Sequence, residues 1–128
     1  MKIALLAIFS ILMGKIAYAE PIYLDCSYNL GSDTILFSVK LDEDTNTITH
    51  TREDGSFFNS VGFFSASEMS YQRIIIGQGI KVIQKYTINR ISLSVQSQIS
   101  AGSVRFPDEV PMEVIGANSG ACSIVTVD

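Results

Sequence analysis

Apolar and polar residues alternate along most of the chain after residue 20, a pattern typical of β-strands with one buried and one exposed face. It is clearest from Thr34 to Leu41, where every second residue from Ile35 on is apolar, and from Ile91 to Ile99, where serine and glutamine fill the alternate positions. Runs rich in acidic residues, asparagine and glycine interrupt the pattern and predict turns. The sequence therefore predicts a protein made almost entirely of short strands.

The alternation predicts about eight strands and no helix of ordinary length, with one helical turn at 66–70. The glycines at 77–79 predict a tight turn, and 101–111 is the longest stretch without periodicity. Residues 20–128 are enough for one domain, so we expect a single small antiparallel barrel or sandwich. The expected strands are 22–28, 34–41, 47–51, 56–64 (one bent strand or two short ones), 71–76, 80–88, 91–99, 112–115 and 122–127, the last two joined by a loop at 116–120.

Two details predict how side chains are shared between the two faces. Apolar residues occupy even positions at Tyr86 and Ile88 and odd positions from Ile91 on, so a turn or bulge between them has to absorb the change. The phenylalanine pairs at 57–58 and 63–64 place neighbouring rings on opposite faces. We therefore expect one ring of each pair in the core and one outside, where it offers an apolar surface.

The first nineteen residues have the features of a secretory signal peptide. Lys2 precedes an uncharged apolar run from Ile3 to Met13, and Ala17–Ala19 forms a small-x-small cleavage site before Glu20. This run is shorter than the roughly 20 apolar residues of a membrane span. We expect cleavage after Ala19 and a periplasmic or secreted mature protein, residues 20–128, without a membrane anchor.

The chain has two cysteines, Cys26 and Cys122, near the two ends of the expected mature protein. Export exposes them to an oxidising compartment, so we expect them to pair. Cys26 follows an aspartate rather than the small residue that a lipoprotein needs. Closing a loop of about 100 residues stabilises a fold by roughly 4 to 5 kcal/mol in the chain-entropy account.

Charge excludes several classes of partner. Without residues 1–19 the chain keeps 7 basic and 13 acidic residues, a formal charge of −6. Binding to nucleic acid or to anionic lipid needs clustered lysine and arginine. We therefore expect neither nucleic acid nor a membrane surface as a partner, and a basic protein is favoured electrostatically.

The segment Tyr86-Thr87-Ile88-Asn89-Arg90, followed thirty residues later by Gly120-Ala121-Cys122, resembles a pattern of small exported proteobacterial proteins that are uncharacterised. A first cysteine soon after the signal and an acidic hairpin at 42–47 fit this pattern too. The resemblance covers most of the mature chain. It implies an exported β domain and no particular activity.

The nearest approach to a metal motif begins at Asp42. Together with Asp44, Asn46 and Glu53 it matches positions 1, 3, 5 and 12 of an EF-hand calcium loop. Thr47 stands at position 6, where the loop needs glycine, and the flanks are predicted strands rather than helices. We therefore expect a solvated hairpin tip and no metal site.

Catalytic groups are equally sparse. His50 is the only histidine, and with threonine on both sides we expect it at an exposed strand position rather than in a zinc site or a catalytic triad. Carboxylates that could act in pairs fall in loops or at strand ends, where an acidic chain places them by chance: Glu53 with Asp54, and Asp108 with Glu109 and Glu113. We expect no enzymatic activity and no cofactor.

The loop at 101–111 carries Arg105 and Phe106 ahead of Pro107. Arginine and aromatic side chains are favoured at the centres of protein interfaces, so we predict that Arg105 and Phe106 contact a partner protein. The favoured function is a non-enzymatic protein-binding module of inhibitor or immunity type. The alternative is a small-ligand carrier of barrel type, which requires an unfilled interior lined by the 57–64 region.

Overall fold

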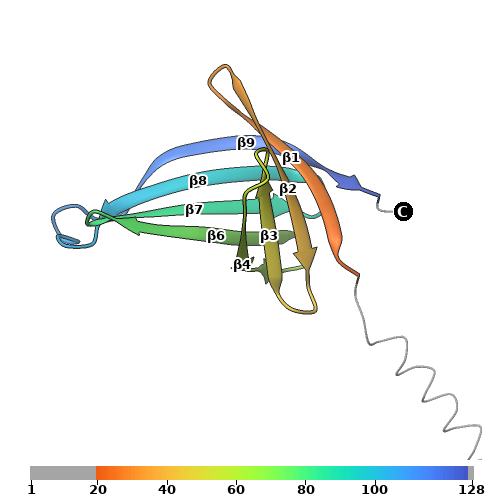
Figure 1. The fold of residues 1–128 in the computed structure, drawn as a ribbon, viewed down its shortest axis with the longest axis horizontal. Helices are drawn as coiled ribbons and strands as arrows, with labels where there is room; N and C mark the ends of the chain where they lie inside the picture. The colour runs from red at the N-terminus through yellow and green to blue at the C-terminus, as the bar shows by residue number, and fades with distance from the viewer. Residues whose placement is uncertain (1–19, 127–128) are drawn as a thin grey trace, which may run out of the picture.

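The computed structural model describes residues 20–126, which form nine antiparallel strands (Figure 1). The predicted signal peptide and its cleavage site after Ala19 lie outside or at the border of the described residues. The all-β class and the antiparallel arrangement are as predicted. The strands are β1 (Ile22–Leu30), β2 (Asp33–Asp42), β3 (Thr47–Arg52), β4 (Phe57–Val61), β5 (Phe63–Phe64), β6 (Glu68–Gly77), β7 (Ile80–Asn89), β8 (Ser94–Ser103) and β9 (Glu113–Val125).

All nine strands belong to one sheet in the order β4-β3-β2-β1-β9-β8-β7-β6-β5. The sheet coils until its two ends meet. At the meeting point the N–H of Gln72 in β6 donates to Oγ of Ser60 in β4 over 3.3 Å. Gly62 separates β4, which pairs with β3, from β5, which pairs with β6. The result is a nearly closed, barrel-like sheet in which 57–64 acts as one bent strand around the corner.

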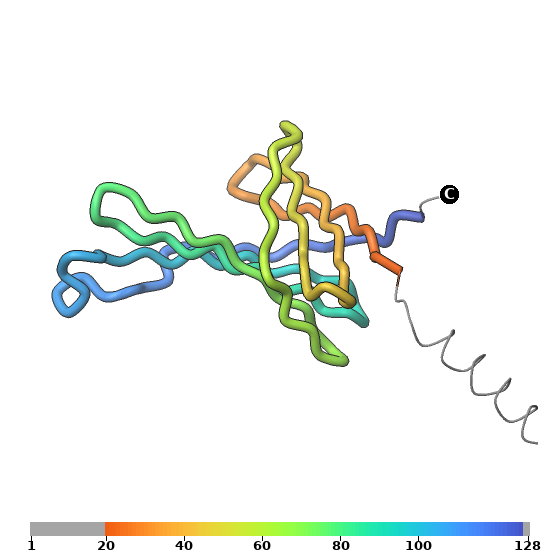
Figure 2. Tube along the Cα trace, turned by 60° about the horizontal axis from the view of Figure 1, so that its bottom comes forward, coloured from red at the N-terminus to blue at the C-terminus, as the bar shows by residue number. Residues whose placement is uncertain are grey.

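The strands β6 to β9 extend further in one direction than the strands β1 to β4 that cross them. Figures 1 and 2 show β1 to β4 crossing one end of the β6 to β9 layer, while the other end of that layer extends past them. β1 pairs with β9 only along Tyr23–Tyr28, so the earlier part of β9 has no neighbour on that side among the described residues. We call the uncovered part of these two hairpins, residues 73–84 and 99–116, the arm.

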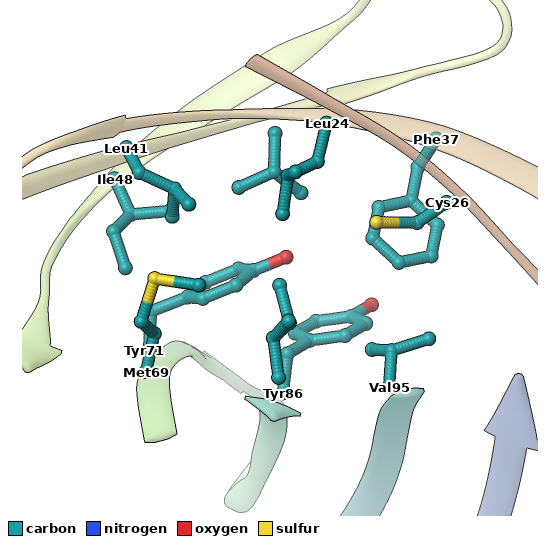
Figure 3. Packing of buried hydrophobic residues seen from close by; sticks show 11 residues of the cluster. Leu24, Cys26, Phe37, Leu41, Ile48, Met69, Tyr71, Tyr86 and Val95 are labelled. Carbon is teal, nitrogen blue, oxygen red and sulfur yellow. The ribbon is translucent and has the colours of Figure 1, made fainter. Parts of the chain in front are cut away.

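The hydrophobic core fills the covered end, where side chains from β1, β2 and β3 meet those from β6, β7 and β8 (Figure 3). The predicted alternation is confirmed, since Phe37, Val39 and Leu41 of β2 are all buried. Each aromatic pair also divides as expected, with Phe57 and Phe63 exposed and the second ring of each pair packed against the core. The buried cluster comprises Leu24, Cys26, Phe37, Val39, Leu41, Ile48, Met69, Tyr71, Tyr86, Ile88 and Val95.

The predicted disulfide is present. Cys26 and Cys122 face each other directly in the β1–β9 pairing, 96 residues apart in sequence. The bond joins the first and last strands of the described chain. By restricting the unfolded chain over so long a loop, it stabilises the closure of the sheet.

The residues of the Tyr-x-Ile-Asn-Arg segment have structural roles at the covered end. Tyr86 and Ile88 are buried in the core. The side-chain oxygen of Asn89 accepts the backbone N–H groups of residues 91 and 92 and so shapes the turn after β7. Arg90 forms an ion pair with Glu43, which links this turn to the one between β2 and β3.

Three boundaries differ from the prediction. Ile91 lies in the turn between β7 and β8 and is 83% exposed, so the change of face occurs within a turn and the strand starts only at Ser94. In the segment 66–70, residues 66 and 67 form a bend and residues 68 to 70 already belong to β6, so there is no helical turn. The expected loop at 116–120 belongs to one continuous strand, β9, and at Gly120 the absence of a side chain lets the backbone of β1 approach closely.

Two glycines of β9 provide a matched test of this close approach. A Cβ at Gly120 would overlap the carbonyl oxygen of Ser27 in β1, whereas a Cβ at Gly116 would meet nothing within 4 Å. We expect Gly120→Ala to lower the free energy of unfolding by about 1 to 3 kcal/mol through overpacking. Gly116→Ala should be neutral or slightly stabilising, because alanine loses less conformational freedom in a strand. Urea denaturation of both variants measures the difference, and equal effects would show that β1 and β9 are not so closely packed.

Candidate functional site at the barrel mouth

His50 occupies the buried face of β3, at 3% exposure, and the predicted exposed position is wrong. It pairs with Val39, just as the buried Ile48 pairs with Leu41. Side chains two residues apart share a face of a strand. The burial of His50 could therefore have been predicted from the apolar residue Ile48, two positions earlier on the same face of the strand.

The imidazole lies between two phenylalanine rings. Its centroid is 4.6 Å from that of Phe37 and 4.9 Å from that of Phe58, with interplanar angles of 10° and 17°. Nδ1 is hydrogen-bonded to the hydroxyl of Tyr71 over 2.7 Å, and Tyr71 stacks on Tyr86 at 5.0 Å. A continuous aromatic cluster thus runs from the core to the edge of the covered region.

The titratable groups of this cluster are all neutral near pH 7. Burial, followed by the charges of Arg52 and Arg73, lowers the pKa of His50 from 6.5 to about 4. Burial raises the pKa of Tyr86 to about 12 and raises that of Tyr71 well above its usual value. His50 therefore serves as a neutral packing and hydrogen-bonding group, and its pKa is unsuited to a general base at neutral pH.

Two arginines border the cluster where the covered end opens towards the arm. The guanidinium carbons of Arg52 and Arg73 lie 5.3 and 5.4 Å from the centroid of the Phe58 ring, within the range of cation–π attraction. Neither guanidinium forms an ion pair with a carboxylate of the described residues. Nη1 of Arg52 donates to Oγ of Ser56 over 3.2 Å, and the buried Nη2 has no acceptor in the described part of the chain.

Arg52 and Arg73, together with His50, Phe37 and Tyr86 of the aromatic cluster, line an open cavity of about 320 Å³, which we call the barrel mouth. The floor is apolar and aromatic, with Ile35, Phe37 and Tyr86, and the rim carries polar and charged groups. The rim residues are Tyr28, Arg52, Glu53, Asp54, Arg73 and Gln84. The sequence pattern gave no reason to group the two arginines, since Arg52 ends β3 and Arg73 lies in β6, and they meet only at Phe58 of β4, where the sheet closes.

The predicted contact residues Arg105 and Phe106 lie elsewhere, at the tip of the arm. The N–H of Val104 donates to the carbonyl of Gly79 over 2.8 Å, which ties the 104–110 loop to the β6–β7 turn. Phe106 is 58% exposed. Its backbone N–H donates to Ser103 and its carbonyl accepts Val110 N–H, so the loop has a defined conformation. The contact itself stays a prediction.

The calcium-like residues are separated by the fold. Asp42 ends β2 and Glu53 follows β3, so they lie at opposite ends of β3. Asp42 accepts the backbone N–H of Thr45 over 3.4 Å. The described residues contain no group of three or more histidine, cysteine, aspartate or glutamate side chains placed to hold a metal ion.

No protein-family model, curated protein or solved structure matches this chain. Across residues 20–126 no helix is long and apolar enough to cross a membrane.

The low pKa of His50 predicts a specific pH dependence of stability. The folded protein binds this proton only below about pH 4, whereas the unfolded chain binds it below about pH 6.5. The contribution of His50 to the free energy of unfolding is thus complete above pH 6.5. It falls, by up to about 3 kcal/mol, as the pH is lowered to 4. Because the chain has a single histidine, an NMR titration of its ring reports the midpoint directly.

The matched variant is His50→Phe, which keeps a ring in the stack and all carboxylates unchanged. Its unfolding free energy should fall less between pH 6.5 and 4 than that of the natural protein. A ring titration with a midpoint near 6.5, or identical pH profiles for the two proteins, would contradict the buried, neutral His50.

Proposed function

We propose that this protein is an exported, non-enzymatic protein-binding module of inhibitor or immunity type, acting in the periplasm or the medium. Its partner adds a strand to the free edge of β6 in the arm. The observation that supports this proposal most strongly is the edge of β6 from Ile74 to Gly77, which carries three exposed isoleucines and has no strand beside it among residues 20–126. The disulfide between Cys26 and Cys122 fits an oxidising compartment.

The edge of β6 is open because its neighbours on that side are short. β5 pairs with β6 only at Met69 and Ser70, and Ser60 of β4 accepts the N–H of Gln72. Backbone N–H groups alternate in direction along a strand, so those of Ile74 and Ile76 point away from β7, as that of Gln72 does. They can pair with an extended segment of a partner.

Exposed strand edges are usually defended by charges, proline or bulges. The other edge of the arm, in β9, has such a defence: the register with β8 shifts between Ile99 and Ser100. β6 pairs with β7 without interruption from Glu68 to Gly77 and presents three consecutive exposed isoleucines, Ile74, Ile75 and Ile76. An undefended apolar edge on a folded protein favours a strand-pairing function.

The tip loop extends this surface. Arg105 packs across the β6–β7 turn, within 3.4 Å of the position that a Cβ on Gly79 would take. Gln78 and Gly79 have positive φ angles of 52° and 78°, as in the type I′ turn of a tight hairpin. Because turn and loop are ordered before binding, Arg105 and Phe106 would lose little freedom on contact.

Charge separates the two halves of the molecule. Residues 20–68 hold nine acidic and two basic side chains, whereas residues 69–126 hold three acidic and five basic ones. An acidic β1–β4 layer would attract a basic partner at long range, which mainly raises the association rate. The apolar edge of the arm would then supply the short-range contacts.

A backbone variant with a matched control tests strand addition. Ile74→Pro removes an N–H that points to the open edge and leaves the β6–β7 ladder intact, whereas Ile74→Ala keeps that N–H and removes the same side chain. With the mature protein as bait in periplasmic extract, a partner captured by the natural protein should be lost with Ile74→Pro and largely retained with Ile74→Ala. Thermal unfolding of each bait confirms that it is folded.

The tip loop is tested with the same captured partner. The double change Arg105→Ala and Phe106→Ala should weaken binding by at least about 2 kcal/mol, as at an interface hot spot, with thermal stability nearly unchanged. Phe57→Ala, an exposed ring on the β1–β4 layer, is the control. Equal binding by the Ile74→Pro protein and the natural protein would disprove strand addition, and loss of binding only in Phe57→Ala would move the contact to the β1–β4 layer.

A further inference from the structure

We propose that the barrel mouth, which borders the arm at Arg73 and Gln84, is a binding site for a small organic carboxylate, distinct from the strand-pairing edge at 74–77. Arg52 and Arg73 would bind the carboxylate group, and the aromatic floor of the mouth would cover its apolar part. The proposal depends on the placement of the two guanidinium groups, on the cavity between them and the floor, and on the chemistry of the rim.

The two arginines share the cavity with two carboxylates, Glu53 and Asp54, but within residues 20–126 neither guanidinium is in direct ion-pair contact with a carboxylate. The guanidinium groups contact the ring of Phe58 from two different strands. Nη2 of Arg52 is buried without an acceptor, and a buried charged donor without an acceptor is unfavourable. An anion in the mouth offsets this cost, and planar guanidinium groups match the geometry of a carboxylate.

The floor and the size of the cavity indicate the rest of the ligand. Phe37 and Tyr86 present aromatic surface, Ile35 is aliphatic, and the volume is about 320 Å³, at the lower end of the range for ligand pockets. The space deeper in the barrel is filled by buried side chains such as Tyr71 and Leu24. The mouth therefore suits a molecule with a single small apolar ring or chain, and excludes a long lipid tail.

The acidic residues on the rim favour one negative charge over several. Glu53 and Asp54 line the same cavity. Asp54 accepts hydrogen bonds from the backbone N–H and the hydroxyl of Ser56 (2.9 and 2.6 Å), and the same hydroxyl accepts from Arg52, so Ser56 separates this carboxylate from the guanidinium. The hydrogen bonds from Ser56 and, to a smaller extent, the charge of Arg52 lower the pKa of Asp54. A monoanion gains the attraction of both guanidinium groups, whereas a phosphate dianion is more strongly repelled by the two carboxylates.

Calorimetric titration of the mature protein with three probes tests the assignment. Benzoate has the proposed chemistry, benzamide has the same shape without the charge, and inorganic phosphate has the charge without the ring. We expect saturable benzoate binding, with benzamide and phosphate each at least about tenfold weaker. This comparison uses the unaltered protein, so it does not depend on the folding of any variant.

Two charge-matched variants locate the site. Arg73→Gln removes a guanidinium from the mouth, and Lys85→Gln removes a charge from an exposed position of β7, on the face opposite Tyr86. We expect Arg73→Gln to lower the affinity for benzoate at least about tenfold and Lys85→Gln to leave that affinity unchanged. The double change Arg105→Ala and Phe106→Ala, at the tip of the arm and outside the cavity lining, should also leave benzoate binding normal, so failure of the arm proposal and failure of this one give different results.

Three results would overturn the proposal: no saturable binding of benzoate, equal binding of benzamide, or preferential binding of phosphate. Equal loss in Arg73→Gln and Lys85→Gln would also overturn it, because the effect would then reflect net charge alone.

Discussion

The pairing of β1 with β9 is the constraint on which the rest of the structure depends. It joins the first strand to the last over only six residue pairs, Tyr23–Tyr28 with Gly120–Val125. The Cys26–Cys122 bond lies within this short interface and holds its register, and Gly120 lets the two backbones come together. Because the pairing is short, it closes the sheet at one end and leaves the remaining length of β6 to β9 uncovered.

The two candidate surfaces follow from this unequal closure. Where the cover ends, the core stops at an aromatic cluster, and the polar ends of Arg52, Arg73 and Gln84 take the place of further apolar packing. Beyond that point β6 has no strand on its outer side in the described chain. A single geometric feature, the difference in reach between two halves of one sheet, thus produces both a cavity and a free edge.

Much of the fold could be predicted from local pattern. The alternation in β2, the tight turn at 77–79, the change of face after Ile88 and the disulfide all depend on neighbouring residues or on simple counting. The site was harder to predict, since Arg52 and Arg73 meet only through the coiling of the sheet. His50 was misplaced because its polar character outweighed its position two residues after Ile48, although a neutral imidazole packs between rings without a large penalty. The free edge was not predicted at all, because an apolar run such as Ile74 to Ile76 has the same pattern in a covered strand.

Amide hydrogen exchange along β6 tests the unequal closure most directly, in the isolated protein and without knowledge of any partner. Arg73 and Ile75 direct their N–H groups to β7, whereas Ile74 and Ile76 direct theirs to solvent. We predict alternating exchange along β6, with Ile74 and Ile76 exchanging at least about a hundredfold faster than Arg73 and Ile75. Uniform protection from Arg73 to Ile76 would show that the edge of β6 is already paired, and would contradict the unequal closure of the sheet.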